Sequence, residues 1–190
     1  MLFDESRYQM LRRSHRVGAV VRHEDDTAST MDDARTGAKA GDPPGTAYIA
    51  AAQSAGRGRL GRSWVSVPEA GLWVTYYLHL STDALPPSVA AGLAVCDAVE
   101  AAAGLACDLK WPNDVQRAGR KLCGILTESV ATGNGVDVFM GIGINMRTPS
   151  DMPEEVVAIA TSIEQEGRPS PSREVMLAAL SSALEVRLSQ

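Results

Sequence analysis

The sequence predicts an α/β (α+β) fold in which a mixed, largely antiparallel sheet is flanked by helices. Alanine- and leucine-rich stretches at 89–104 and 172–188 have the apolar spacing of helices. Residues 133–135, Gly-Asn-Gly, supply hairpin-turn chemistry between the last two strand-like segments, which favours antiparallel pairing. A chain of 190 residues suits one domain, which we divide into a lead-in of weak periodicity, 1–26, and a core, 29–190.

The first helix is expected to begin directly after the pair Ser29-Thr30. Apolar residues follow at helical spacing, and Thr30 with Asp33 resembles a capping box. Two glycines and two prolines within 41–45 end that helix.

The remaining elements are strands, recognised by runs of β-branched, aromatic and aliphatic residues. They are expected at 48–53, 72–80, 107–110, 122–130 and 136–144. The first of these runs ends in polar residues, so we expect it to lead into a functional loop.

Composition excludes several classes of protein. The formal net charge is −5, which leaves no excess of positive charge for general nucleic-acid binding. No apolar run approaches the roughly 20 residues that span a bilayer, and the N-terminal residues lack the apolar segment of a signal peptide. The three cysteines lack metal-ligand spacing, so we expect reduced thiols in a cytoplasmic protein.

The segment 56–64, GRGRLGRSW, is the most informative part of the chain. Its glycines allow close approach to a ligand, and its arginines repel one another unless an anion or nearby acids neutralise them. Such a loop could stay mobile when empty and close over a phosphate. It matches the dinucleotide fingerprint and nearly matches a P-loop, but both need a helix to follow at once, whereas 64–68 is β-like and ends in proline. A solvated basic hairpin without a ligand is the structural alternative.

Lysine is rare here, with three residues against fifteen arginines. Segment 110–114, KWPND, surrounds a rigid proline with a cation, an aromatic ring and a carboxylate, although an ordinary turn would also use these residues. Lys121 opens a strand close to Gly124, and its ammonium is expected at the mouth of the sheet. Segment 141–145, GIGIN, has two strand glycines that suggest close approach by a ligand, and Asn145 could read a base edge or cap a turn.

Together, the motifs GRGRLGRSW, KWPNDV, KLCGIL and GIGINM, in this order, resemble the catalytic domain of the biotin protein ligases. The resemblance runs from about Ser29 to the final helix. It implies a fold related to the class II aminoacyl-tRNA synthetases. It also implies a two-step reaction, in which biotin and ATP form biotinyl-5′-AMP, with Mg²⁺ screening the pyrophosphate, and biotin then passes to a lysine of a carrier protein.

The resemblance also implies roles for individual residues. The catalytic cations are Lys121, Arg57 and Arg59. The biotin-binding residues are Ser29, Thr30, Gln53, Gly56, Arg57, Lys121 and Gly124. The ATP- and adenylate-binding residues are Arg57, Gly58, Arg59, Trp64, Lys110, Asn113, Lys121 and Asn145. Asp114 is the candidate metal ligand or acceptor of the incoming lysine's proton.

One position departs from the family pattern. Met31 stands where the family usually has asparagine beside the biotin ureido group. A thioether cannot donate or accept hydrogen bonds comparably, so we expect only a backbone contact there.

The implied partner is the biotin carboxyl carrier domain of acetyl-CoA carboxylase or another biotin-dependent carboxylase, with no nucleic acid and no membrane. An exposed sheet edge could pair two subunits. We expect neither the DNA-binding domain of repressor-type members nor the small C-terminal β-barrel common in the family. Two alternatives remain open: a lipoate-type protein ligase, and a non-catalytic biotin- or adenylate-binding module.

Overall fold

The computed structural model describes residues 3–81, 86–150, 152 and 154–189. In chain order its elements are α1 (Glu5–Leu11), β1 (Val21–Thr27), α2 (Thr30–Ala40), β2 (Ala47–Gln53), a 3-10 turn η1 (Arg59–Gly61), β3 (Gly71–Leu80), α3 (Pro87–Ala103), β4 (Asp108–Lys110), β5 (Asp114–Arg117), β6 (Arg120–Thr132), β7 (Gly135–Asn145), α4 (Glu154–Val157) and α5 (Arg173–Leu188).

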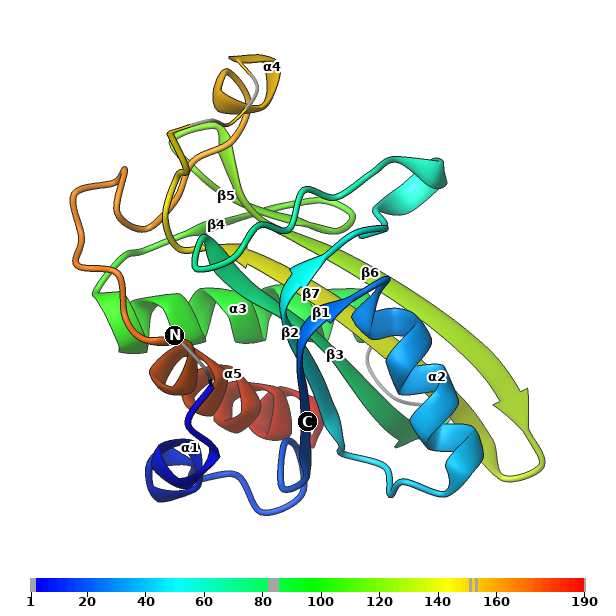
Figure 1. Ribbon diagram of the computed structural model, residues 1–190. Coiled ribbons are helices and arrows are strands. Elements are labelled where there is room, and N and C mark those ends of the chain that lie inside the picture. Colours follow the sequence, from blue (N-terminus) through cyan, green and yellow to red (C-terminus); the bar gives the residue numbers. More distant parts are fainter. Residues whose placement is uncertain (1–2, 82–85, 151, 153, 190) are drawn as a thin grey trace.

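The strands form one seven-stranded sheet in the order β1-β2-β3-β7-β6-β5-β4 (Figure 1). β1 and β2 are parallel, and every other neighbouring pair is antiparallel. The β6–β7 hairpin closes where Thr132 pairs with Gly135, as the glycine-asparagine turn predicts. The mixed, largely antiparallel sheet with flanking helices is therefore confirmed.

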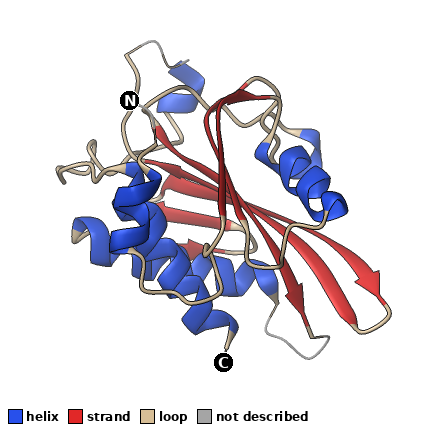
Figure 2. Cartoon of the chain, turned by 60° about the horizontal axis from the view of Figure 1, so that its bottom comes forward, coloured by secondary structure: helices blue, strands red, loops and turns tan. Residues whose placement is uncertain are grey.

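The two faces of the sheet have different chemistry because side chains alternate along each strand. On β3, Leu72, Val74 and Tyr76 point into the main core, and each is at most 1% exposed. On β7 the residues Met140, Ile142 and Ile144 do the same. α3 and α5 lie side by side against this face, while α2 lies on the opposite side of the sheet (Figures 1 and 2).

The alanine-rich α3 packs closely between the sheet and α5. Six of its small or β-branched residues are at most 1% exposed: Ala90, Ala91, Ala94, Val95, Ala98 and Val99. Small side chains let the helix axes approach, and burial of this apolar surface stabilises the fold at about 25 cal/mol per Å². Gly104 ends the helix in the left-handed conformation, with φ of 63°. None of the described helices is both long and apolar enough to span a membrane.

α2 covers only part of the second face. Met31 and Ala34 of this helix pack against Tyr48, Tyr77 and Phe139 in a small separate cluster. The helix does not use the capping box predicted at Thr30 and Asp33. Instead, the Ser29 hydroxyl caps it by accepting from the Met31 amide, and the Asp33 carboxylate accepts from the Thr27 hydroxyl.

The structure contains elements that the sequence pattern does not predict. Two of them, α1 and β1, lie within the supposed lead-in 1–26. α1 is anchored because the fully buried Tyr8 donates its hydroxyl hydrogen to the Gly18 carbonyl. β1 is an edge strand with five consecutive exposed residues, so it lacks the alternation that marks a strand. β5 occupies Asp114–Arg117 and follows a turn at 111–113, so the ordinary turn considered for segment 110–114 is present.

The final helix fastens the segment before β1 through one carboxylate. Glu185 accepts hydrogen bonds from the backbone amides of His15, Arg16 and Val17 at 2.8, 2.7 and 2.9 Å. Burial alone would raise its pKa, but the three amide donors together hold the pKa of Glu185 below its ordinary value.

We therefore expect Glu185→Gln to lower the free energy of unfolding by about 1 kcal/mol at neutral pH. The folded-state pKa is lowered, so this stabilisation is complete above the unfolded pKa of about 4.3 and is lost as the pH falls through the folded value. Urea unfolding at several pH values should show the difference in unfolding free energy between wild type and variant becoming smaller as the pH falls below about 4.3. Glu100→Gln, at an exposed position of α3, is the control, and a gap independent of pH would contradict the assignment.

Candidate functional site

The uncovered part of the second sheet face forms a cavity of about 60 Å³. Its walls come from the start of α2, the loop 53–64, the β4–β5 turn and strands β3, β6 and β7. Three hydroxyl side chains line it and are almost completely buried: Ser29, Thr30 and Thr75 are 2%, 4% and 1% exposed. The cationic side chains Arg57 and Lys121 are 40% and 32% exposed. This first cavity therefore runs from buried neutral hydroxyls to accessible positive charge.

Hydrogen bonds fix the hydroxyl end. Gln53 Oε1 accepts from the backbone amide and the hydroxyl of Thr30, at 2.9 and 3.2 Å. The hydroxyls of Thr30 and Thr75 lie 2.9 Å apart, and Gln53 Nε2 donates to the Ser66 hydroxyl at 2.7 Å. Met31 contributes its side chain to the cavity lining, where only a backbone contact was expected. Its Cε lies 3.0 Å from the position that a Cβ on Gly141 would take.

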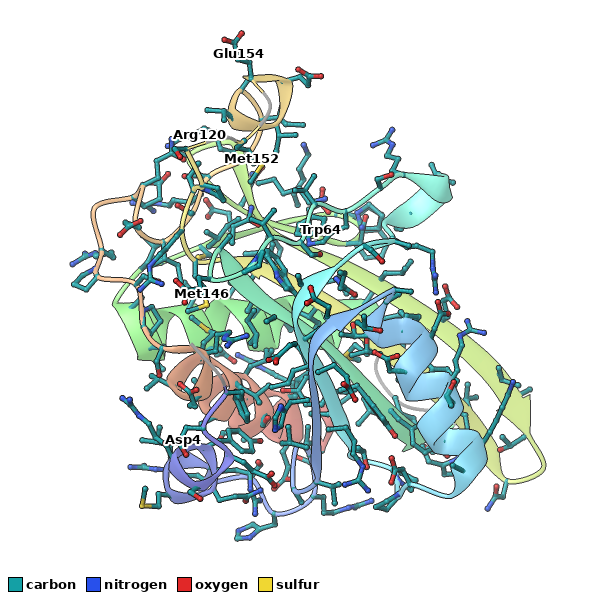
Figure 3. The ribbon with its side chains drawn as sticks, in the orientation of Figure 1. Asp4, Trp64, Arg120, Met146, Met152 and Glu154 are labelled. Atoms are coloured by element: carbon teal, nitrogen blue, oxygen red, sulfur yellow. The ribbon has the colours of Figure 1, made fainter. Side chains whose placement is uncertain are left out.

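Glycines of β6 and β7 form a flat seat for Trp64. Gly124 and Gly143 are direct partners across the two strands. A Cβ on either glycine would lie 2.7 or 2.6 Å from atoms of the Trp64 indole, so only glycine leaves room for the ring here. Trp64 lies where the loop crosses the sheet (Figure 3), and its buried Nε1 has no hydrogen-bond partner among the described residues.

The chain's own side chains neutralise or fix the loop arginines. Arg57 makes a bidentate pair with Asp32 at the start of α2, with N–O distances of 2.8 and 2.6 Å. That hydrogen-bonded pair lowers the pKa of Asp32 and raises the pKa of Arg57. Arg59 Nη1 donates to Asn113 Oδ1 at 3.0 Å. The loop therefore bridges α2 and the β4–β5 turn. Asp32 provides a counter-charge for Arg57, whereas Arg59 is bound by a neutral amide.

Lys121 lies between a carboxylate and an aromatic ring. Its Nζ is 2.7 Å from Asp114 Oδ1 and 5.2 Å from the centre of the Trp64 ring. Asp114 is thus the counter-ion of Lys121. The described ranges contain no group of three His, Cys, Asp or Glu side chains that could hold a metal ion, so Asp114 could act as a metal ligand only together with oxygens from a substrate.

A second cavity of about 350 Å³ adjoins the first. It lies between loop residues 58–65 and the segment 145–161, and Asp114 and Asn145 also line it. The two cavities share five lining residues, all of which the sequence predicted as ligand contacts: Gly58, Arg59, Trp64, Asn113 and Lys121.

Other predicted site residues lie apart. Lys110 is exposed and lines neither cavity, and Gly56 also lines neither. A Cβ on Gly56 would lie 2.5 Å from the Trp64 carbonyl oxygen, which explains the glycine by backbone packing. Sequence reasoning missed Thr75 and Asp32. Thr75 had a signal, because it is the polar residue in an otherwise apolar run and faces away from the core.

Fold and site together define the class: a mixed-sheet domain of the class II synthetase-like type, with two cavities that meet at cationic side chains. The chain belongs to the biotin/lipoate A/B protein ligase family, whose family model matches residues 27–145.

Relatives and solved structures agree with this assignment. The chain is 40% identical over 154 residues to the bifunctional ligase/repressor BirA of Bacillus spizizenii, covering 78% of this chain and 47% of that protein. It is 37% identical over 172 residues to the biotin–[acetyl-CoA-carboxylase] ligase of Mycobacterium tuberculosis, covering 86% and 62%. The biotin protein ligase of Aquifex aeolicus, solved with biotin and ATP, superposes with a TM-score of 0.76 at 29% identity, covering 90% of this chain and 71% of that one. The chain thus spans about half the length of the first of these relatives.

Gly143→Ala tests the glycine seat. The added methyl group should displace the Trp64 indole from β7 while the fold stays intact, because the clash is with a loop side chain rather than with the core. We expect the tryptophan fluorescence to change. We also expect at least a tenfold loss of any catalytic activity that requires the loop 56–64 to be in place. Gly133→Ala, where a Cβ meets nothing within 4 Å, is the control. Unchanged fluorescence and activity in Gly143→Ala would exclude the seat.

Proposed function

We propose that this chain is an ATP-dependent ligase that adenylates biotin and transfers it to a lysine of a carrier protein. The shared wall of the two cavities carries this proposal. An acid in the first cavity and a nucleotide in the second would meet at Arg59 and Lys121. Relatives described as biotin ligases, and the neighbour solved with biotin and ATP, support the same function.

The buried hydroxyls favour biotin over lipoate as the acid. The ureido group of biotin offers a carbonyl acceptor and N–H donors, which the buried hydroxyls of Ser29, Thr30 and Thr75 can complement. The dithiolane ring of lipoate offers no comparable group, so it would cover these hydroxyls without forming hydrogen bonds to them, and each such hydrogen bond is worth about 1 kcal/mol. Thus the hydroxyl end selects the ring, and the cationic end receives the carboxylate.

In the first step, a carboxylate oxygen of biotin attacks the α-phosphorus of ATP. The new oxygen–phosphorus bond forms as the bond to the pyrophosphate oxygen breaks, giving biotinyl-5′-AMP and pyrophosphate. Two anions must approach, and negative charge develops on the phosphoryl oxygens. Lys121, Arg57 and Arg59 bring fixed positive charge and N–H donors to that place, and the loop over them excludes water from the reactive anhydride. Mg²⁺ would accompany the phosphates of the substrate rather than occupy a protein site.

Asn145 would explain a preference for adenine over guanine in the second cavity. Its Nδ2 donates to the backbone carbonyls of Lys121 and Thr161, at 3.4 and 3.1 Å. Both amide hydrogens are therefore directed to the protein, which leaves Oδ1 as the group that Asn145 can offer as an acceptor to the second cavity, which this residue lines. A hydrogen-bond acceptor pairs with the exocyclic amine of adenine. The carbonyl oxygen of guanine is itself an acceptor, so its approach to Oδ1 is unfavourable.

In the second step, the ε-amine of a carrier lysine attacks the anhydride carbonyl and AMP leaves. Asp114 is the nearest carboxylate to Lys121 and could take the proton from that amine. We propose the biotin carboxyl carrier domain of acetyl-CoA carboxylase or another biotin-dependent carboxylase as the partner, and the cytoplasm as the compartment.

The exchange of labelled pyrophosphate into ATP tests this function. We expect exchange that depends on biotin and is at least a hundredfold weaker with lipoate, since only the ureido group of biotin can form hydrogen bonds to the three buried hydroxyls. Preference for lipoate would assign the chain to the other branch of the family. Tight biotin binding without exchange would favour a non-catalytic binding module.

Lys121→Ala should lower that exchange more than a hundredfold, or about 3 kcal/mol, because charge stabilisation at the α-phosphate is lost. Lys39→Ala, which removes an exposed lysine at the far end of α2, should leave it unchanged. Exchange at the wild-type rate in Lys121→Ala would remove the role assigned to this residue.

A further inference from the structure

The backbone of Lys121 is held by a segment that is not a sheet strand. Pairing between β6 and β7 starts at Cys123 with Ile144, so Lys121 lies beyond the end of its neighbour β7. The segment Ile159–Thr161 takes the place of that neighbour. The Lys121 amide donates to the Ile159 carbonyl at 2.9 Å, and the Thr161 amide donates to the Lys121 carbonyl at 2.8 Å.

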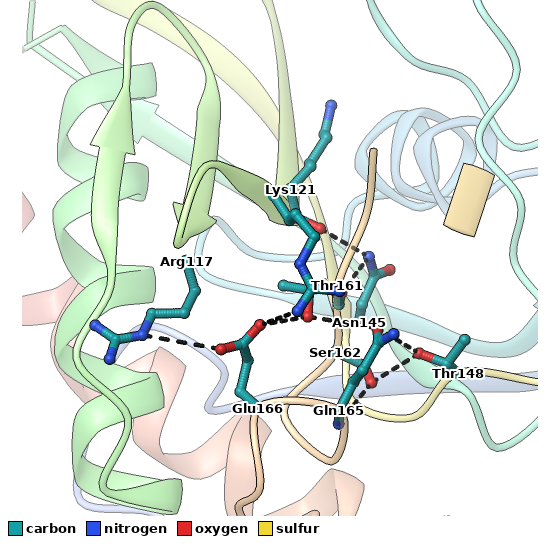
Figure 4. A network of polar contacts seen from close by, with 9 residues as sticks. Arg117, Lys121, Asn145, Thr148, Thr161, Ser162, Gln165 and Glu166 are labelled. Carbon is teal, nitrogen blue, oxygen red and sulfur yellow. Dashed lines mark hydrogen bonds and ion pairs between the residues drawn. The ribbon is translucent and has the colours of Figure 1, made fainter. Parts of the chain in front are cut away.

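Side chains fasten this segment to β6 around one carboxylate (Figure 4). The Glu166 carboxylate accepts from the Thr161 hydroxyl at 2.7 Å and from Arg120 Nη2 at 2.7 Å. Arg117 Nε lies 4.0 Å from its other oxygen. The Glu166 side chain is 13% exposed, so solvent screens these ion pairs less than it screens surface pairs.

Glu166 is also outside both cavities. It lines neither of them, and neither do Arg117 and Arg120. The segment that it fastens, however, contributes Ile159, Ala160 and Thr161 to the lining of the second cavity. It also forms hydrogen bonds to the backbone of Lys121, one of the five residues that line both cavities. Movement of this segment would therefore change the nucleotide side of the site and leave the hydroxyl end unaltered.

We propose that Glu166 is a positioning residue for the nucleotide half of the site. It holds the segment 159–161 against β6 and thereby sets the width of the second cavity. The proposal rests on the proposed adenylation function, because the nucleotide is what the second cavity would bind.

Two measurements on Glu166→Ala test the proposal: steady-state kinetics of pyrophosphate exchange, and calorimetry of biotin binding. The control is Glu164→Ala, because Glu164 is an exposed residue in the same turn. We expect the KM for ATP to rise about fivefold to thirtyfold, while the Kd for biotin stays within about twofold of wild type. A general loss of folding would move both constants, so this split separates positioning from instability. Glu166→Gln, which keeps an acceptor for Thr161 but loses the charge, should give an intermediate KM.

A double-mutant cycle with Arg120→Ala tests whether Glu166 acts through Arg120. If Glu166 acts through Arg120, the double variant should be no worse than either single variant. Three results would each overturn the proposal without affecting adenylation by the wild type. They are an unchanged KM for ATP in a folded Glu166→Ala or Glu166→Gln, equal losses of ATP and biotin affinity, and fully additive effects of the Glu166 and Arg120 substitutions on the KM for ATP. A wild-type chain without biotin-dependent exchange would overturn the proposed function, and this inference with it.

Discussion

The alternation of side chains along β3, β6 and β7 is the constraint on which the rest of the molecule depends. One set of positions must be large and apolar to pack against α3 and α5, and this fixes the register of all three strands. The other set is then free to be small or polar on the opposite face. Thr75, Gly124 and Gly143 occupy that second set, so the same register that closes the core opens the site.

Carboxylates of the same chain balance part of the positive charge of the site. Three cations brought together without counter-charges would destabilise the loop by mutual repulsion. Asp32 pairs with Arg57 and Asp114 pairs with Lys121, so the site can fold before an anion arrives. These pairs are partly exposed and individually worth about 1 kcal/mol or less, which lets an incoming carboxylate or phosphate replace the internal partner at little cost.

Much of this arrangement could be predicted from the sequence, for physical reasons that differ by region. The strands 72–80 and 136–144 were recognisable because strands buried over most of their length consist of β-branched, aromatic and aliphatic residues. β1 was not, because a polar edge strand gains its order from parallel pairing with β2, which is a tertiary effect. The motif residues indicated the cationic centre, but spacing could not show that Lys110 points away from it or that Asp32 would reach Arg57.

The two halves of the site differ in how firmly the fold holds them. The hydroxyl end is built on a helix N-terminus and a central strand, with buried hydrogen bonds that cost free energy to break. The reacting end is built on the loop 56–64 and the segment 159–161, which side-chain pairs fasten to the sheet. A rigid end suits selection of one ring, since an ill-fitting ligand leaves polar groups unsatisfied. An adjustable end suits a reaction in which a triphosphate enters, pyrophosphate leaves and a protein lysine must then reach the same carbonyl.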